Sequence, residues 1–161
     1  MWHFLFGLRG RISRASFSLY AAVAFVGLLA LMSALYAYEL LEGGYETGES
    51  APWPSTPLGI TGATLWFAML GVLVVSALCV TLKRLHDRDK PAWWLLVFLV
   101  LPNALSSAGQ FWRYRDPESA DEIGAVLYLA ALAFFGWAFI DLLCLRGTEG
   151  ENRFGPDPLR R

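Results

Sequence analysis

FSLYAAVAFVGLLALMSALYAY, residues 17–38, is a run of apolar and small residues without a single charged side chain. A helix rises about 1.5 Å per residue, so a run of this length can cross the roughly 30 Å of bilayer hydrocarbon. Backbone exposed to lipid must satisfy its own hydrogen bonds, which a helix does. The run therefore predicts a transmembrane helix.

Three further apolar runs have the length of a span, at about residues 58–82, 92–112 and 123–145. Hydrophobic residues make up 56% of the 161-residue chain and charged residues only 17%, against about 25% charged residues in soluble domains. The charges gather in short segments between the apolar runs. We predict an all-α fold, an integral membrane bundle of four transmembrane helices, in a single domain covering residues 1–161 with a tail at 146–161.

The third run differs from the others because its second half is polar. Pro102 lacks a backbone donor and predicts a kink in this helix. Asn103 and the serines and glutamine that follow it are poorly suited to lipid. Three interpretations stay open: these groups are satisfied by neighbouring helices, they line a hydrated cavity, or the segment is re-entrant.

Basic residues indicate the orientation, because lysine and arginine in short loops favour the cytoplasmic side. Most of the 13 basic residues lie before the first run, between the second and third, or after the fourth; they are Arg9, Arg11, Arg14, Lys83, Arg84, Arg88, Lys90, Arg146, Arg153, Arg160 and Arg161. The loop from Glu39 to Pro57 has four glutamates and no basic residue. We therefore expect both termini in the cytoplasm of a bacterial inner membrane protein.

The N-terminal motif is GLRGRISRASF, residues 7–17. Ser13 or Ser16 is expected to cap the first span by accepting hydrogen bonds from orphan backbone donors. Arg11 and Arg14 suit two roles. They act as a topology signal attracted to anionic lipid, or they bind a phosphate or carboxylate through bidentate guanidinium contacts.

The second motif is KRLHDRDKPAWW, residues 83–94, which is predicted to be a tight turn between the second and third spans. Arg84 lies where the second helix is expected to end, where a cation suits the helix dipole. His86 and Asp87 are adjacent. The motif is interpreted either as a hairpin fixed by local salt bridges or as a proton-sensing or ligand-binding site.

The third motif is RGTEGENRFGPDP, residues 146–158, and its glycines and prolines predict a structured turn that folds back onto the cytoplasmic face. Asn152 and Arg153 supply polar groups there. Asp141 is the one carboxylate well inside a predicted span, and such groups usually pair or line a cavity. An arginine of the N-terminal motif or Arg84 is its expected partner.

These three motifs resemble the YhaH-type bacterial inner-membrane proteins, classed as domain of unknown function 805. The resemblance rests on Gly10, Arg11 and Arg14, on Arg84-Leu85-His86-Asp87 with Trp93 and Trp94, and on Gly147, Gly150, Asn152, Phe154, Gly155, Asp157 and Pro158. One departure is Arg88-Asp89-Lys90-Pro91, where the family usually has a small or glycine-bearing turn. The resemblance implies residence in the inner membrane and no established activity.

The leading hypothesis is a non-enzymatic membrane protein that binds an anionic lipid head group, a small anion or a protein partner at its cytoplasmic face. The predicted site consists of Arg11, Arg14, Arg84, His86, Asp87, Asn152 and Arg153, with Asp141 in an internal ion pair. No nucleophile–base pair, phosphate loop or zinc-ligand spacing is present in the sequence, so we expect no catalytic residues, no metal and no cofactor.

Three alternatives remain at this stage. The first is a small transporter or channel, working as a homo-oligomer because four spans enclose little volume. The second is a membrane enzyme in which His86 and Asp87 act as acid and base on a lipid. The third is a structural role in which the polar motifs only hold the bundle together. The net charge of −1 gives no reason to expect nucleic acid as a partner, so lipids and membrane proteins are the expected partners.

Overall fold

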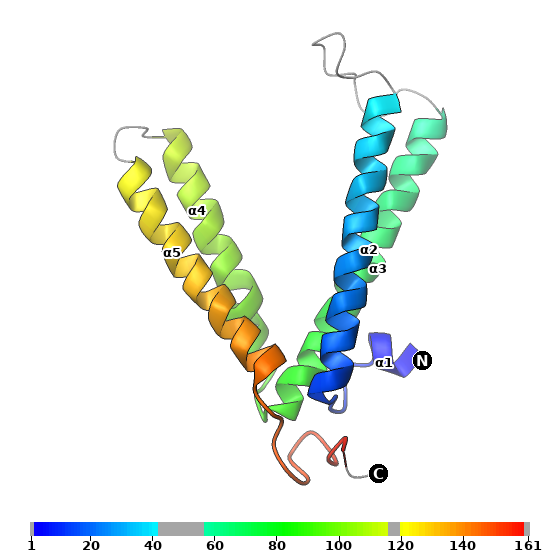
Figure 1. The fold of residues 1–161 in the computed structure, drawn as a ribbon, viewed down its shortest axis with the longest axis vertical. Helices are drawn as coiled ribbons and strands as arrows, with labels where there is room; N and C mark the ends of the chain where they lie inside the picture. The colour runs from blue at the N-terminus through cyan, green and yellow to red at the C-terminus, as the bar shows by residue number, and fades with distance from the viewer. Residues whose placement is uncertain (1, 42–56, 116–119, 160–161) are drawn as a thin grey trace. The chain divides into compact units, whose positions relative to one another are not determined.

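The computed structural model describes residues 2–41, 57–115 and 120–159, and its regular elements there are all helices (Figure 1). They are α1 (Trp2–Phe6), α2 (Arg14–Leu41), α3 (Pro57–Asp87), the π-helical turn η1 (Leu96–Val100), α4 (Leu101–Arg115), α5 (Ala120–Phe139) and the π-helical turn η2 (Ile140–Cys144). Most of the predicted acidic loop, 39–57, lies outside the described residues.

The chain forms two compact units, which are described separately. One consists of Met1–Ser18 and Cys79–Arg161, and the other of Leu19–Leu78. The prediction of a single membrane domain stays a prediction.

Three helices in the described ranges are long and apolar enough to cross a membrane, over Arg14–Ala37, Gly59–Asp87 and Glu122–Cys144. Their apolar side chains point outward: Val26 is 64% exposed, and Leu65 and Leu132 are each 65% exposed. Soluble monomers rarely expose contiguous apolar surface of this extent, whereas lipid covers it in a bilayer. The all-α membrane architecture predicted from the sequence is therefore present.

The predicted third span is also helical, but it lacks the uniformly apolar composition of the other three. The backbone N–H of Leu101 bonds to the carbonyl of Leu96, five residues back, so the turn before Pro102 is π-helical. Pro102 itself has no N–H to donate. The regular α-helical hydrogen-bond pattern is thus interrupted at the predicted proline, and helices occupy all four predicted ranges while three have the composition of a span.

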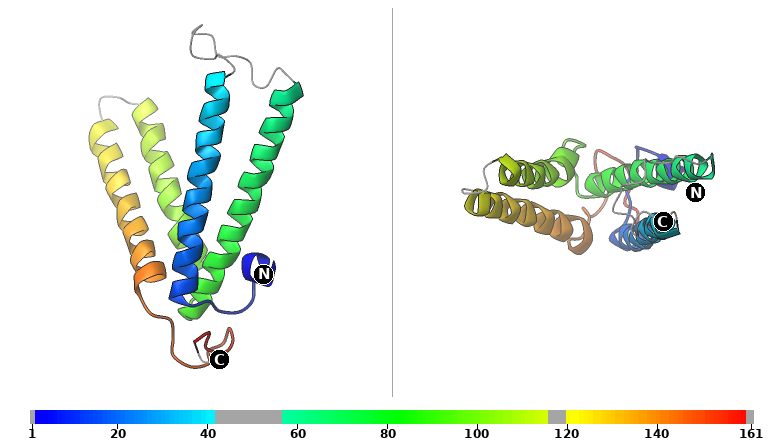
Figure 2. Two further views of the ribbon diagram at one scale, coloured as in Figure 1. Left: turned by 45° about the vertical axis from the view of Figure 1, so that its right-hand side comes forward. Right: turned by 90° about the horizontal axis from the view of Figure 1, so that it is seen from above.

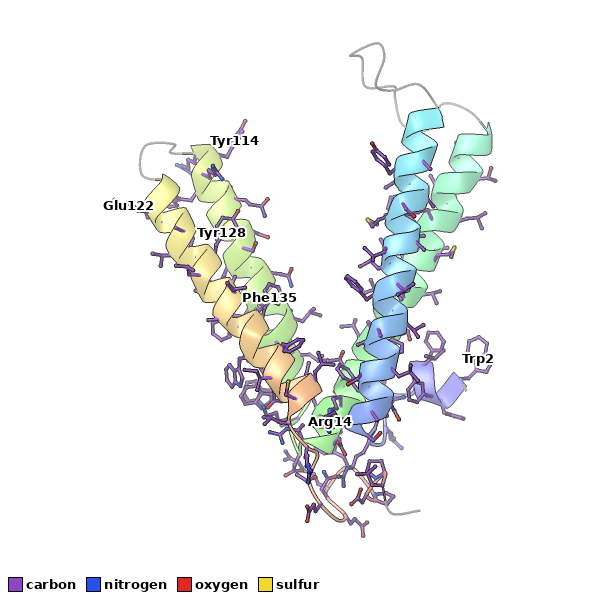
Figure 3. All side chains as sticks on the ribbon, viewed as in Figure 1. Trp2, Arg14, Tyr114, Glu122, Tyr128 and Phe135 are labelled. Atoms are coloured by element: carbon purple, nitrogen blue, oxygen red, sulfur yellow. The ribbon has the colours of Figure 1, made fainter. Side chains whose placement is uncertain are left out.

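Helices α4 and α5 lie side by side (Figures 1 and 2) and approach closely at two glycines. A Cβ added at Gly109 would lie 3.5 Å from the ring of Tyr128 and 3.6 Å from the carbonyl oxygen of Gly124. Figure 3 labels Tyr128 on α5. Small residues at the crossing let two backbones approach, which is how helices pack in lipid, where burial of apolar surface gives no driving force.

In the unit Leu19–Leu78, α2 and α3 are joined by polar contacts. The hydroxyl of Tyr20 donates to Ser76 Oγ at 3.0 Å, and the indole N–H of Trp66 donates to the carbonyl of Leu31 at 2.9 Å. The second bond uses a carbonyl in the middle of α2. Such interhelical bonds are worth about 0.6 kcal/mol each in a membrane.

The second span extends further than predicted. Residues 83–87 were expected in a turn, but α3 continues through Asp87. The helix then closes with a Schellman motif, in which Asp89 N–H bonds to the carbonyl of His86 and Lys90 N–H to that of Leu85. Asp89 takes the left-handed conformation, φ 55°, at the position that usually requires glycine. The turn therefore consists of Arg88 to Pro91, and Arg84 and Asp87 lie one helical turn apart on α3.

The unit of Met1–Ser18 and Cys79–Arg161 also contains the start of α2. Ser13 Oγ accepts the backbone N–H of Ser16 at 3.2 Å, so Ser13 is the N-cap. Before it, the short helix α1 was not predicted from the sequence. The ammonium of Lys83 holds α1 by donating to the carbonyls of His3, at 2.7 Å, and Phe4.

Candidate functional site

The centre of the polar network is the carboxylate of Asp87, which binds two arginines. Its Oδ1 accepts from Arg11 Nε at 3.2 Å and Nη2 at 3.1 Å, and its Oδ2 accepts from Arg84 Nη1. The three side chains are 3%, 1% and 0% exposed. Two cations around one buried carboxylate leave a net positive charge, which only further acceptors can stabilise. We call Asp87, Arg11 and Arg84 the Asp87 hub.

Arg84 finds its further acceptors at the end of the last helix. Its Nε donates to the carbonyl of Leu142 at 2.8 Å and its Nη2 to that of Leu145 at 2.5 Å. Carbonyls in the last turn of a helix have no partner within the helix. Arg84 therefore ties the end of α3 to the end of η2 and neutralises the partial negative charge there.

Arg11 finds its further acceptors in the tail. Its Nη1 donates to the carbonyls of Gly150, at 2.6 Å, and Gly155, at 3.3 Å, and its Nη2 donates to the carbonyl of Thr148. All of these acceptors are backbone carbonyls, so Arg11 holds the backbone of the tail in a defined conformation. The predicted folding back of the tail is confirmed for its described residues.

The tail is also joined to the last turn of α3 by both side-chain and backbone groups of its own. Asn152 Nδ2 donates to the carbonyl of His86 at 2.9 Å, and Thr148 donates its N–H to the carbonyl of Asp87 at 2.8 Å. The ring of Phe154 stacks on that of His86 with centroids 3.9 Å apart and planes 5° apart. His86 is therefore a packing surface for the tail.

Glycine is required at position 147 because the backbone there passes very close to the carboxylate of Asp87. A Cβ at this position would lie 2.0 Å from Asp87 Oδ2. Nothing larger than hydrogen fits while the carboxylate stays in the hub. The glycine marks where the chain leaving η2 passes directly over the Asp87 hub.

Asp141 forms the predicted internal ion pair, but its predicted partner is wrong. Its Oδ1 accepts from Lys90 Nζ at 2.7 Å and lies 3.4 Å from Arg88 Nη2. The expected partner Arg84 is instead held by Asp87, because both stand on one face of the extended α3. Lys90 reaches Asp141 because the Schellman turn directs the chain back toward the last helix.

The remaining predicted site residues lie at the edge of the network. Arg153 pairs with Asp89 at 3.0 Å, and both side chains are about half exposed. Arg14, labelled in Figure 3 at the start of α2, donates to the carbonyl of Cys144 at 2.9 Å and is exposed. The sequence interpretation missed Lys90, Arg88 and Thr148. The first two were visible as basic residues of the hairpin motif.

Beside the hub, the tail and the start of α2 line a partly open cavity of about 290 Å³. Its polar lining residues include Ser13, Arg14, Arg146, Thr148, Glu149 and Asp157. Within the described part of the chain, the guanidinium of Arg146 makes no hydrogen bond or ion pair. Asp157 is engaged, because its oxygens accept the N–H groups of Gly150 and Leu159.

A metal centre is not indicated: in the described ranges, no group of three or more His, Cys, Asp or Glu residues is arranged to hold an ion. The site has two parts: the buried Asp87 hub, whose charged groups bind one another and backbone carbonyls, and the cavity beside it, which is lined by the exposed Arg14 and Arg146. The cavity is lined by both signs of charge, because Glu149 and Asp157 stand beside Arg14 and Arg146.

Comparison with known proteins gives one family. The family model described as "Protein of unknown function (DUF805)" matches residues 5–156. The chain is 29% identical to "Inner membrane protein YhaH" of Escherichia coli (strain K12) over 156 residues, covering 94% of this chain and 87% of that protein. It is 28% identical to "Uncharacterized protein YiiR" of the same strain over 159 residues, covering 95% and 86%. No solved structure matches significantly.

Proposed function

The chain belongs to the family of proteins of unknown function DUF805 and is an inner-membrane protein, and we propose that it binds the phosphate of an anionic lipid head group in the cavity beside the start of α2. The Asp87 hub holds the cavity's walls in place. The ligand contacts come from Arg14 and Arg146. Membrane lipids are thus the primary partners in this proposal.

The position of the cavity is the observation that carries the proposal. Three of its lining residues mark the ends of candidate spans: Arg14 begins one, Asp87 ends another, and Arg146 lies two residues after the third. The ends of spans lie where hydrocarbon gives way to head groups. A cavity at that depth is bordered by lipid phosphates without any need for a soluble ligand to diffuse in.

The chemistry of the lining favours a singly charged phosphodiester over free phosphate. Arg14 uses one of its donors on the carbonyl of Cys144 and keeps the others for a ligand. Guanidinium groups match phosphate oxygens in fork geometry. Glu149 and Asp157 also line the cavity, and their charge opposes a dianion more strongly than a monoanion.

The proposal includes four spans with both termini in the cytoplasm, and the contacts in one compact unit support this by parity. Arg11 and Arg14 lie just before or at the start of α2, Asp87 ends α3, and Cys144 ends η2. The bonds Arg11–Asp87 and Arg14–Cys144 join these ends, which supports the proposal that they share one side of the membrane. Asp141 pairs with Lys90 of the turn after α3. If α5 crosses once, the segment between Lys90 and α5 must cross once as well. The basic residues then assign that side to the cytoplasm.

The test is native mass spectrometry of the full chain released from micelles that contain phosphatidylglycerol or phosphatidylethanolamine, with an inorganic phosphate arm. We expect wild-type protein to retain phosphatidylglycerol. One charge-assisted hydrogen bond is worth about 1.5–3 kcal/mol, so Arg14→Ala and Arg146→Ala should each weaken retention about tenfold or more.

The matched control is Arg113→Ala, which removes one exposed arginine from the end of α4, away from the cavity. Loss of retention in this variant equal to that in Arg14→Ala would show attraction by net charge alone and reject the site. Equal competition by inorganic phosphate would reject a lipid ligand. Preference for phosphatidylethanolamine would reject the anionic head group.

A further inference from the structure

A second cluster lies around Lys90 and does not involve the cavity. The ammonium of Lys90 is 4.4 Å from the ring centroid of Trp94, 5.1 Å from that of Phe98 and 5.9 Å from that of Trp137. Its fourth neighbour is the carboxylate of Asp141, at 2.7 Å. We call Trp94, Phe98, Trp137 and Asp141 the Lys90 box.

The walls of the box are set at the angles of an enclosing cage. Trp94 and Phe98 stand at 84° and 80° to Trp137, with centroids 5.5 and 5.4 Å apart. Three ring faces around one cation, closed by one carboxylate, form the arrangement that binds alkylated ammonium ions, because the rings attract the charge and contact the alkyl groups. A simple lysine–carboxylate ion pair does not require this enclosure.

Two further observations indicate more than a fixed ion pair. The second oxygen of Asp141, Oδ2, is buried and has no hydrogen-bond partner among the described residues, although the side chain is only 3% exposed. Two walls also come from the π-helical turns, Phe98 from η1 and Asp141 from η2. Single π-helical turns cost regular hydrogen bonding and occur frequently at functional sites.

Lys90 reaches the box from outside the helices that build it. It follows the Schellman turn of α3, precedes Pro91, and its side chain is 19% exposed. Arg88 also lies near Oδ1 of Asp141, at 3.4 Å, and shares the carboxylate's charge. Withdrawal of Lys90 would therefore not leave Asp141 without a cation.

We propose that the Lys90 box is a binding site for an alkylated organic ammonium ion, and that the chain's own Lys90 occupies it as an internal competitor. The ligand would place its alkyl groups against Trp94, Phe98 and Trp137 and its charge against Asp141. The proposal is independent of the phosphate cavity, since no residue of the box lines that cavity.

The probe is tetramethylammonium chloride added to the full chain in detergent micelles, with sodium chloride at equal ionic strength as the reference. Binding between aromatic faces moves the methyl proton resonance upfield, a shift that a surface ion pair does not produce. We expect wild-type protein to bind saturably. Lys90→Met keeps an apolar stem and removes the competing charge, so it should bind at least tenfold more tightly.

Variants of the walls give the opposite result. Asp141→Asn and Trp137→Leu should each weaken binding at least tenfold. Trp137 is 44% exposed and uncharged, so its replacement tests the box without removing a buried charge, as Asp141→Asn does. Lys83→Met is the matched control, because Lys83 contacts α1 and not the box.

The outcomes decide the proposal. Binding to Lys90→Met without binding to wild type would mean that Lys90 is a permanent strut and that the variant has only an artificial hole. Unchanged binding in Asp141→Asn, or equal tightening in Lys83→Met, would place the ion elsewhere. Each of these results would overturn the assignment.

Discussion

Gly147→Ala tests the Asp87 hub by adding one methyl group. The new Cβ would lie 2.0 Å from Asp87 Oδ2 and 2.5 Å from Asp87 Cγ, far inside van der Waals contact. An exposed carboxylate would turn away from such a contact. The carboxylate of Asp87 cannot turn freely, because Arg84 and Arg11 hold its two oxygens.

The cost follows from what the displaced carboxylate leaves behind. Moving Asp87 out of the hub breaks its contacts with two arginines whose side chains are at most 1% exposed. Breaking a buried ion pair typically costs about 3–5 kcal/mol, since the abandoned charge stays buried. Arg11 and Arg84 keep their carbonyl acceptors, so we expect a loss near the lower end of that range.

The assay is the free energy of unfolding measured by detergent denaturation in mixed micelles, with helical circular dichroism as the signal. Gly136→Ala is the matched control, because a Cβ at Gly136 of α5 meets nothing within 4 Å. Replacing a helical glycine by alanine stabilises by about 0.5–1 kcal/mol where there is room. The two glycine-to-alanine changes should therefore act in opposite directions.

A double-mutant cycle identifies the cause. Asp87→Ala removes the group that the new methyl meets, so Gly147→Ala should add less than about 1 kcal/mol of destabilisation in that background, and the two effects should be strongly non-additive. If Gly147→Ala is as stable as wild type, or if its cost persists unchanged without Asp87, the close approach does not govern this site.

Further expectations concern other contacts. Arg84→Lys should destabilise by about 3–5 kcal/mol, because lysine cannot reach the three acceptors that the guanidinium bridges; Arg153→Ala, which breaks an exposed pair, should cost at most about 1 kcal/mol by the same denaturation. Gly109→Ala should be tolerated, since its Cβ meets ordinary contacts, whereas Gly109→Leu should separate α4 from α5 and abolish a cysteine crosslink between them. Asp89→Gly should relieve about 1 kcal/mol of left-handed backbone strain. In wild type the substitution also removes the ion pair with Arg153, so the net stabilisation should be smaller there than in the Arg153→Ala background, where that pair is already absent.

The helical framework was predictable because lipid imposes a simple rule on sequence. Long apolar runs have to be helices, and all four predicted ranges are helical. The boundary of α3 was not predictable from hydropathy, because Lys83 to Asp87 is charged and looks like a loop. The helix continues because Arg84 and Asp87 form an ion pair across one helical turn. A hydropathy average over a sequence window does not register such a pairing.

The sequence predicted which residues of the site lie near one another, but not which of them form ion pairs. Topology alone put the three motifs on one side, and Arg11, Arg84, Asp87 and Asn152 do lie together. Which cation meets which carboxylate depends on helix rotation within about one residue. For that reason the sequence paired Asp141 with the wrong basic residue.

The arginines of the Asp87 hub differ from the arginines that line the cavity, so the structural role of the hub and the proposed lipid binding can be tested separately. Helices in lipid gain little from burying apolar surface, so polar ties at the membrane boundary contribute much of the specificity of their arrangement. Such ties depend on one another, because removing Asp87 leaves two buried arginines without their carboxylate. Arg14 and Arg146 stand outside the hub and are exposed. Their replacement leaves the hub complete, so a change in lipid retention in those variants reports on the cavity and not on the fold.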